Sequence, residues 1–180
     1  MTCLVEHMAS RGASPGTYYT DGETATFMLY NGSRLVGYQV YRPGASKEKR
    51  NDPREGRYYT YLPRDVDGFY SRDFGGPLYI VEGIFKAIKL HNLGLSAVAV
   101  LGATPRRLVS WFRIMRRQRP IIAIGDADRA GAELVKIVGR GFQSPKDLDE
   151  MTDAEVRKLL LAYEVCQSLP KTFAALRGFE

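Results

Sequence analysis

The sequence predicts an α/β fold, in which a parallel sheet with flanking helices follows a small mixed α+β N-terminal lobe. From residue 77 onward, short apolar stretches alternate with amphipathic segments, which is typical of strand–helix–strand units with right-handed crossovers. Before residue 76, aromatic and β-branched runs surround turn residues, which is typical of antiparallel strands. We therefore expect a lobe over 1–75, a sheet domain over 76–150 and a helical extension over 151–180.

The N-terminal lobe is expected to begin with a short helix, Leu4–Arg11, which Gly12 ends. Asn31 and Gly32 lie between two β-rich runs, and Asn-Gly in that position is a strong hairpin signal. Residues 44–57 are polar and charged and contain glycine and proline, so we expect a mobile loop. The strands expected in this lobe are Thr26–Tyr30, Leu35–Tyr41 and Tyr58–Leu62.

The second half of the chain supplies the parallel sheet and its helices. Three short apolar runs have the length of buried strands, and glycines or prolines delimit the segments between them. The strands expected here are Leu78–Val81, Ser96–Leu101 and Pro120–Gly125. The helices expected here are Ile84–Leu93, Pro105–Arg117, Arg129–Val138 and Asp153–Cys166.

The charge of the chain favours a polyanionic partner. The formal net charge is +6 and the pI is about 9.4. The basic residues gather in Lys47–Arg57 and Arg106–Arg119, and such clusters attract nucleic acid without reading its sequence. The two cysteines, Cys3 and Cys166, are too few for a disulfide framework or a zinc ribbon. With no signal peptide and no bilayer-spanning stretch, we expect a soluble, cytoplasmic protein that does not bind membranes.

Three carboxylates follow the expected strands. Glu82 comes directly after Leu78–Val81, and Asp126 and Asp128 follow Pro120–Gly125. Loops at the carboxyl ends of parallel strands form the ligand crevice of an open sheet, so these acids should meet at one edge. Neighbouring carboxylates repel one another unless a cation lies between them, and magnesium favours carboxylates together with substrate phosphates. The sequence therefore predicts a divalent-metal site that binds substrate phosphates.

A later acidic segment, Pro145–Glu150, has two interpretations. Its carboxylates Asp147 and Asp149 are either further members of the metal site or simply acids in the first turn of the last helix, where they are favoured electrostatically. The residues themselves leave both interpretations open.

These motifs resemble the TOPRIM domain that DnaG-type primases, topoisomerases and some nucleases share. The resemblance covers roughly residues 77–150 and is carried by LYIVEG, VLGAT, AIGDADRAG and PKDLDE. The N-terminal segments MLYNGSRLVGYQVYRP and GRYYTYLP are similar to the lobe that precedes TOPRIM in bacterial and phage primases. The resemblance implies a TOPRIM-like fold and a primase catalytic core that lacks the zinc-binding domain.

The resemblance also assigns residues. It implies that Glu82, Asp126 and Asp128 are catalytic and hold Mg²⁺ or Mn²⁺, with Asp147 and Asp149 as weaker metal ligands. Two departures concern this site: Lys86 stands where the family often has a second acid, and the interval from Asp128 to Asp147 leaves no room for the usual fourth strand. The residues expected to bind nucleotide or nucleic acid are Lys49, Arg50, Arg57, Lys86, Arg106, Arg107, Arg113, Arg116 and Arg117.

The resulting hypothesis is a nucleotidyltransferase of the DNA primase type. It would join ribonucleoside triphosphates on a single-stranded DNA template, with a replicative helicase as a further candidate partner and, if phage-encoded, in the host cytoplasm. Four tyrosines of the N-terminal lobe either stack on bases or pack in the hydrophobic core: Tyr38, Tyr58, Tyr59 and Tyr61.

Two other functions use the same residues. In a metal-dependent nuclease, water attacks the phosphate in place of a primer hydroxyl. Lys86 is the unusual candidate for the general acid or base of that reaction. In a non-catalytic module the carboxylates would only help to dock on nucleic acid or on a replication protein. A topoisomerase is disfavoured because the chain is too short for a strand-passage gate.

Overall fold

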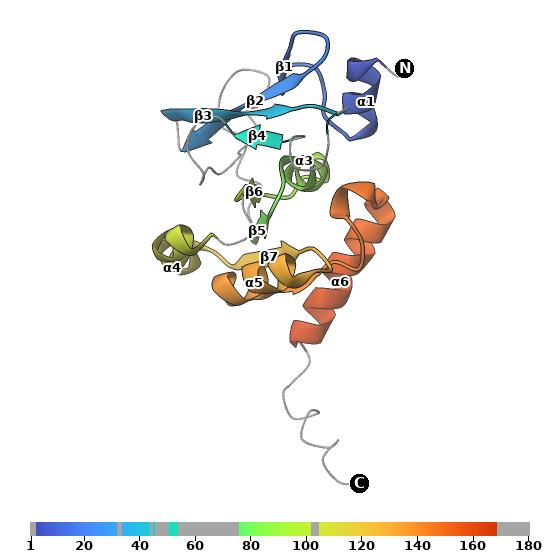
Figure 1. The fold of residues 1–180 in the computed structure, drawn as a ribbon. Coiled ribbons are helices and arrows are strands. Elements are labelled where there is room, and N and C mark those ends of the chain that lie inside the picture. The colour runs from blue at the N-terminus through green and yellow to red at the C-terminus, as the bar shows by residue number, and fades with distance from the viewer. Residues whose placement is uncertain are drawn as a thin grey trace, which may run out of the picture.

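Two four-stranded sheets lie on either side of the helix α3 in the computed structural model (Figure 1). The structure describes residues 3–31, 34–43, 45, 51–53, 76–101 and 105–168. Among these residues, no helix combines the length and the apolar character needed to cross a bilayer.

The N-terminal lobe is an antiparallel sheet with one short helix. The helix α1 spans Leu4–Ser10, as expected. The strands are β1 (Tyr19–Thr20), β2 (Ala25–Asn31), β3 (Arg34–Tyr41) and β4 (Asn51–Pro53), in the order β1-β2-β3-β4. The predicted hairpin is confirmed, because β2 and β3 pair antiparallel around residues 32 and 33.

The strand β4 corrects the prediction of a loop throughout 44–57. Asn51–Pro53 pair with Gln39–Tyr41 at the edge of the sheet. An edge strand pairs through its backbone and tolerates polar side chains and proline, so its sequence resembles that of a loop. The expected strand Tyr58–Leu62 lies outside the described residues.

The second sheet is parallel throughout, which confirms the predicted α/β fold with its TOPRIM-like sheet. Its strands are β5 (Leu78–Val81), β6 (Ala97–Ala99), β7 (Ile121–Gly125) and β8 (Gly141–Gln143), in the order β6-β5-β7-β8. The helices of this half are α3 (Ile84–Asn92), α4 (Val109–Gln118), α5 (Arg129–Val138) and α6 (Asp153–Ser168). Two 3₁₀ turns precede α4 and α6, namely η1 (Arg106–Leu108) and η2 (Leu148–Glu150).

The fourth strand of this sheet overturns a prediction. We expected no room for it between Asp128 and Asp147, yet β8 pairs in parallel with Ala123–Gly125 of β7. Gly141 makes the pairing possible: its φ is +152°, and a Cβ there would lie 2.8 Å from the backbone nitrogen of Ala123. The strand is short and lacks an apolar run, so the sequence contains no periodic pattern that predicts it.

The core covers both faces of the parallel sheet. On one face, Phe112 of α4 and Leu134 of α5 pack with Ile80. The other face joins the N-terminal lobe through α3, where the ring of Phe85 meets Phe27 of β2 at 5.7 Å and Tyr41 of β3 at 4.9 Å between centroids. The helix α6 packs against the same face. The lobe and the sheet thus share one continuous core, and the division at residues 75 and 150 stays a prediction.

Candidate active site

The carboxylates predicted from the sequence lie at the carboxyl ends of two adjacent strands. The strands β5 and β7 pair in parallel with Ile80 opposite Ala123, so both end at the same edge of the sheet. Glu82 is the first residue beyond β5 and Asp126 the first beyond β7. Parallel pairing therefore brings together residues that lie far apart along the chain.

Two glycines fix the turn that carries the aspartates. A Cβ at Gly125 would lie 2.6 Å from the Cα of Gly131, so the end of β7 touches the first turn of α5 backbone to backbone. Asp128 is the N-cap of α5, and its Oδ1 accepts a hydrogen bond from the backbone nitrogen of Gly131 at 2.7 Å. This hydrogen bond holds the Asp126–Asp128 turn against the first turn of α5.

The strand β8 holds the turn from the other side. The side-chain nitrogen of Gln143 donates to the backbone oxygens of Asp126 at 2.8 Å and Asp128 at 2.7 Å. Sequence reasoning missed Gln143, because a single glutamine carries no motif. Its role depends on β8, the strand that the sequence did not predict.

Glu82 is held in an environment that disfavours its charge. Burial, together with the negative charges of Asp126 and Asp128, raises the pKa of Glu82 to about 7, although the charge of Lys86 and a backbone hydrogen bond at Asp126 act in the opposite direction. Its Oε1 is buried and has no hydrogen-bond partner in the described part of the chain. A buried, unpaired carboxylate oxygen is costly and marks a position suited to a cation.

Lys86 brings a positive charge into this cluster. From α3 its amino group forms ion pairs with Asp126 and, at 3.2 Å, with Asp147. Burial by itself would lower the pKa of Lys86, but the hydrogen bond and charge of Asp126, with the charge of Asp147, raise it above its ordinary value. The side chain is only 11% exposed, so Lys86 is a fixed internal cation.

The donor set is chemically suited to a hard divalent cation, since it consists of carboxylate oxygens with one orphaned acceptor. The positions of these side chains do not by themselves complete such a site. No group of three His, Cys, Asp or Glu side chains among the described residues is placed to hold a metal ion. Lys86 neutralises part of the charge that such an ion would otherwise meet.

Replacing Lys86 should reveal how much this cation stabilises the site. We expect Lys86→Met to lower the free energy of unfolding by about 2 kcal/mol at pH 8, because Asp126 loses its buried partner. Lys89→Met is the matched control on the same helix: Lys89 pairs with Asp153, which is 67% exposed, so the change should stay within about 0.5 kcal/mol. Urea denaturation measures both, and equal losses would contradict the prediction.

The later acids occupy a separate turn. Asp147 and Asp149 lie at η2 and not in the first turn of α6, which begins at Asp153, so that interpretation is wrong. Asp147 reaches the site through Lys86. Asp149 instead pairs with Arg11, whose guanidinium lies 3.9 Å from the ring centroid of Phe85. Asp149 thereby connects η2 to α1, and its predicted metal role stays a prediction.

Among the described residues, the predicted basic side chains do not all lie beside the carboxylates. Arg106 pairs with Glu133 at 3.5 Å, and Arg113 is exposed on α4. Arg116 and Arg117 lie at the C-terminal end of α4, beside the start of β7 and therefore away from the carboxylates. Tyr38 is 36% exposed. The remaining predicted residues lie outside those whose side chains the structure describes: Lys49, Arg50, Arg57, Arg107, Tyr58, Tyr59 and Tyr61.

The fold is that of primase catalytic cores. The structure is similar to a DnaG primase catalytic domain bound to ssDNA, with a TM-score of 0.54 and 17% identity over 88% of this chain and 57% of that one. It is also similar to a DNA primase domain from Pseudomonas aeruginosa, with a TM-score of 0.56 and 19% identity over 83% of this chain and 55% of that one.

A third similar structure is the primase fragment of the bacteriophage T7 primase-helicase protein, with a TM-score of 0.55 and 16% identity over 80% of this chain and 63% of that one. The chain thus spans less than two thirds of each of these structures. No family model and no curated protein matches the sequence. At these identities the likeness establishes the fold, and the activity must be argued from the site.

Proposed function

We propose that this chain is a DNA primase-like nucleotidyltransferase that joins ribonucleotides on a single-stranded DNA template. The observation that carries the proposal is the buried, unpaired oxygen of Glu82 beside Asp126 and Asp128, at the carboxyl edge of a primase-type sheet. We assign a divalent cation, Mg²⁺ or Mn²⁺, to these three carboxylates. Once bound, it would neutralise triphosphate charge and make the attacking hydroxyl more acidic.

The chain's own residues would position the reactants. In the proposed reaction a primer 3′-oxygen bonds to the α-phosphorus, the bond to pyrophosphate breaks, and the hydroxyl proton passes to water. Such a transfer depends mainly on alignment and on charge neutralisation. The cap at Asp128 and the Gln143 hydrogen bonds keep the carboxylate turn rigid, while Lys86 supplies a positive charge beside it.

The proposed partners follow from the same similarity. One similar structure is a primase domain bound to ssDNA, and another is a fragment of a primase-helicase protein. We therefore propose single-stranded DNA and ribonucleoside triphosphates as ligands and a replicative helicase as a partner. Tyr38, partly exposed on β3, is a candidate for stacking on a base.

Two parallel incubations separate the candidate activities. The full chain is mixed with unlabelled single-stranded DNA of mixed sequence, Mg²⁺ and labelled ribonucleotides, and in parallel with labelled DNA alone. New labelled oligonucleotides that require the template support primer synthesis, whereas shortening of the DNA supports the nuclease. Glu82→Gln is the control for contaminating enzymes, since it should abolish either reaction.

A non-catalytic binding module is the second candidate, and Lys86 favours it. Its amino group already pairs with Asp126, so the carboxylates are partly neutralised without a metal. In that case neither product forms, and both Glu82→Gln and Asp126→Asn retain binding to single-stranded DNA in EDTA. Template-dependent synthesis by the unaltered chain would exclude this candidate.

A further inference from the structure

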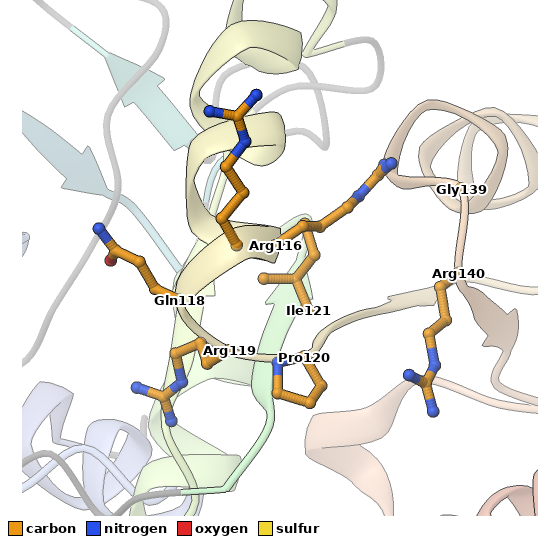
Figure 2. Close-up of a pocket in the computed structure, with 8 residues that line it drawn as sticks. Arg116, Gln118, Arg119, Pro120, Ile121, Gly139 and Arg140 are labelled. Atoms are coloured by element: carbon orange, nitrogen blue, oxygen red, sulfur yellow. The ribbon is translucent and has the colours of Figure 1, made fainter.

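A cavity of about 490 Å³ lies between the C-terminal ends of α4 and α5 and the start of β7 (Figure 2). The residues that line it are Arg116, Arg117, Gln118, Arg119, Pro120, Ile121, Gly139 and Arg140. Because Pro120 and Ile121 lie where β7 begins, the cavity is at the opposite edge of the sheet from Glu82 and Asp126. It is therefore distinct from the candidate active site.

Among the residues that the structure describes, the lining carries four arginines and no acidic residue. The C-terminal ends of two helices point carbonyl groups here, but their combined partial charge is only about −1, so a large positive excess remains. Arg116 uses part of its guanidinium to cap α5, donating to the oxygen of Val138, and Figure 2 shows it extending from α4 toward Gly139. Arg119 donates to the oxygen of Gly76 at 2.8 Å.

These hydrogen bonds divide the arginines into two kinds. Arg116 and Arg119 are anchored to backbone oxygens and hold the walls in place. The side chains of Arg117 and Arg140 are exposed, and no hydrogen bond or ion pair to described residues engages their guanidinium groups. Positive groups held at a concave surface without acidic partners attract an anion, and guanidinium groups match phosphate oxygens in particular.

We infer that this cavity binds phosphate groups of a single-stranded nucleic acid, where the choice of a single strand rests on the proposed function. Within the described part of the lining there is no aromatic ring to stack a base, and Gln118 is the one neutral polar side chain. The site is therefore suited to the backbone and not to a nucleotide's base. Arg113 and Arg117 are one helical turn apart on α4, so the basic surface continues from the cavity along that helix.

The test is the salt dependence of binding to single-stranded DNA, which is independent of primer synthesis. Fluorescence anisotropy with a labelled oligothymidylate compares the full chain with Arg117→Gln/Arg140→Gln in EDTA. We expect several-fold weaker binding and a salt slope that is smaller by about 1.4, because each lost phosphate contact contributes about 0.7 on single strands. Arg157→Gln/Lys158→Gln, an exposed pair on α6, removes the same charge as a control.

Several outcomes would overturn the inference. An equal loss of affinity in the control variant would show that the effect is due to net charge alone. An unchanged salt slope in the cavity variant would show that the cavity does not contact phosphates. Efficient competition by a ribonucleoside triphosphate or inorganic phosphate at micromolar concentration would assign the cavity to a free anion instead of a strand. Circular dichroism and thermal unfolding check that the exposed substitutions leave the fold intact. Absence of primer synthesis by the unaltered chain would refute the proposed function, but it would not change the binding measured for the cavity.

Discussion

Glu82→Gln is expected to abolish primer synthesis and, in the absence of divalent ions, to stabilise the protein. The activity should fall to background because the substitution removes a proposed metal ligand. The free energy of unfolding should rise by about 1–2 kcal/mol at pH 8, because a neutral amide replaces a buried carboxylate that Asp126 and Asp128 repel. Loss of function with a gain in stability is typical of a strained functional group.

The sign of this effect depends on pH. Since the pKa of Glu82 is raised from 4.5 to about 7, the folded state retains the proton over a range in which the unfolded state has lost it. The unfolding free energy of the unaltered chain should therefore decrease as the pH rises from about 4.5 to about 7, and this component should be constant above that. Glu82→Gln should lack this decrease.

Urea denaturation in EDTA at pH 5.5 and pH 8 measures the difference. Glu150→Gln is the matched control, because Glu150 is exposed and forms no ion pair within the described residues. Addition of Mg²⁺ should raise the melting temperature of the unaltered chain and leave that of Glu82→Gln unchanged. A variant that is less stable at both pH values would refute the assigned environment, and an equal response to Mg²⁺ would refute the metal assignment.

Gly125→Ala is expected to cause the largest loss of stability among single substitutions near the site. A Cβ there would lie 2.6 Å from both the Cα and the carbonyl carbon of Gly131, and backbone atoms cannot move aside as a flexible side chain can. The first turn of α5 would have to separate from β7, at a cost of about 3 kcal/mol or more. Asp126 and Asp128 would be displaced with it.

Gly83 provides the comparison. It follows Glu82 as Gly125 precedes Asp126, its backbone is extended with a φ of −117°, and nothing lies within 4 Å of the Cβ position. Gly83→Ala should therefore change the unfolding free energy by less than about 1 kcal/mol. Thermal or urea unfolding distinguishes the two variants. Similar stabilities would mean that α5 does not touch β7 as closely as described.

The periodicity of the sequence determined most of the parallel sheet. Apolar runs followed by glycines identified β5, β7 and α5 within a residue or two, because a buried parallel strand must be almost wholly apolar and a helix needs an amphipathic repeat. Glu82 and Asp126 were predictable as neighbours for the same reason, since the ends of parallel strands meet at one edge.

Tertiary structure decided the features that depend on contacts between distant segments. The strand β8 has no periodic signal, and only the absence of a side chain at Gly141 allows it to pair, so Gln143 could not be assigned a role. The pairing of Lys86 with Asp126, and that of Arg11 with Asp149, likewise required coordinates. So did the arginine cavity, where charges from α4 and from the end of α5 converge. A periodic pattern records which face of each element is buried, whereas the choice of partner across that face is set by three-dimensional packing.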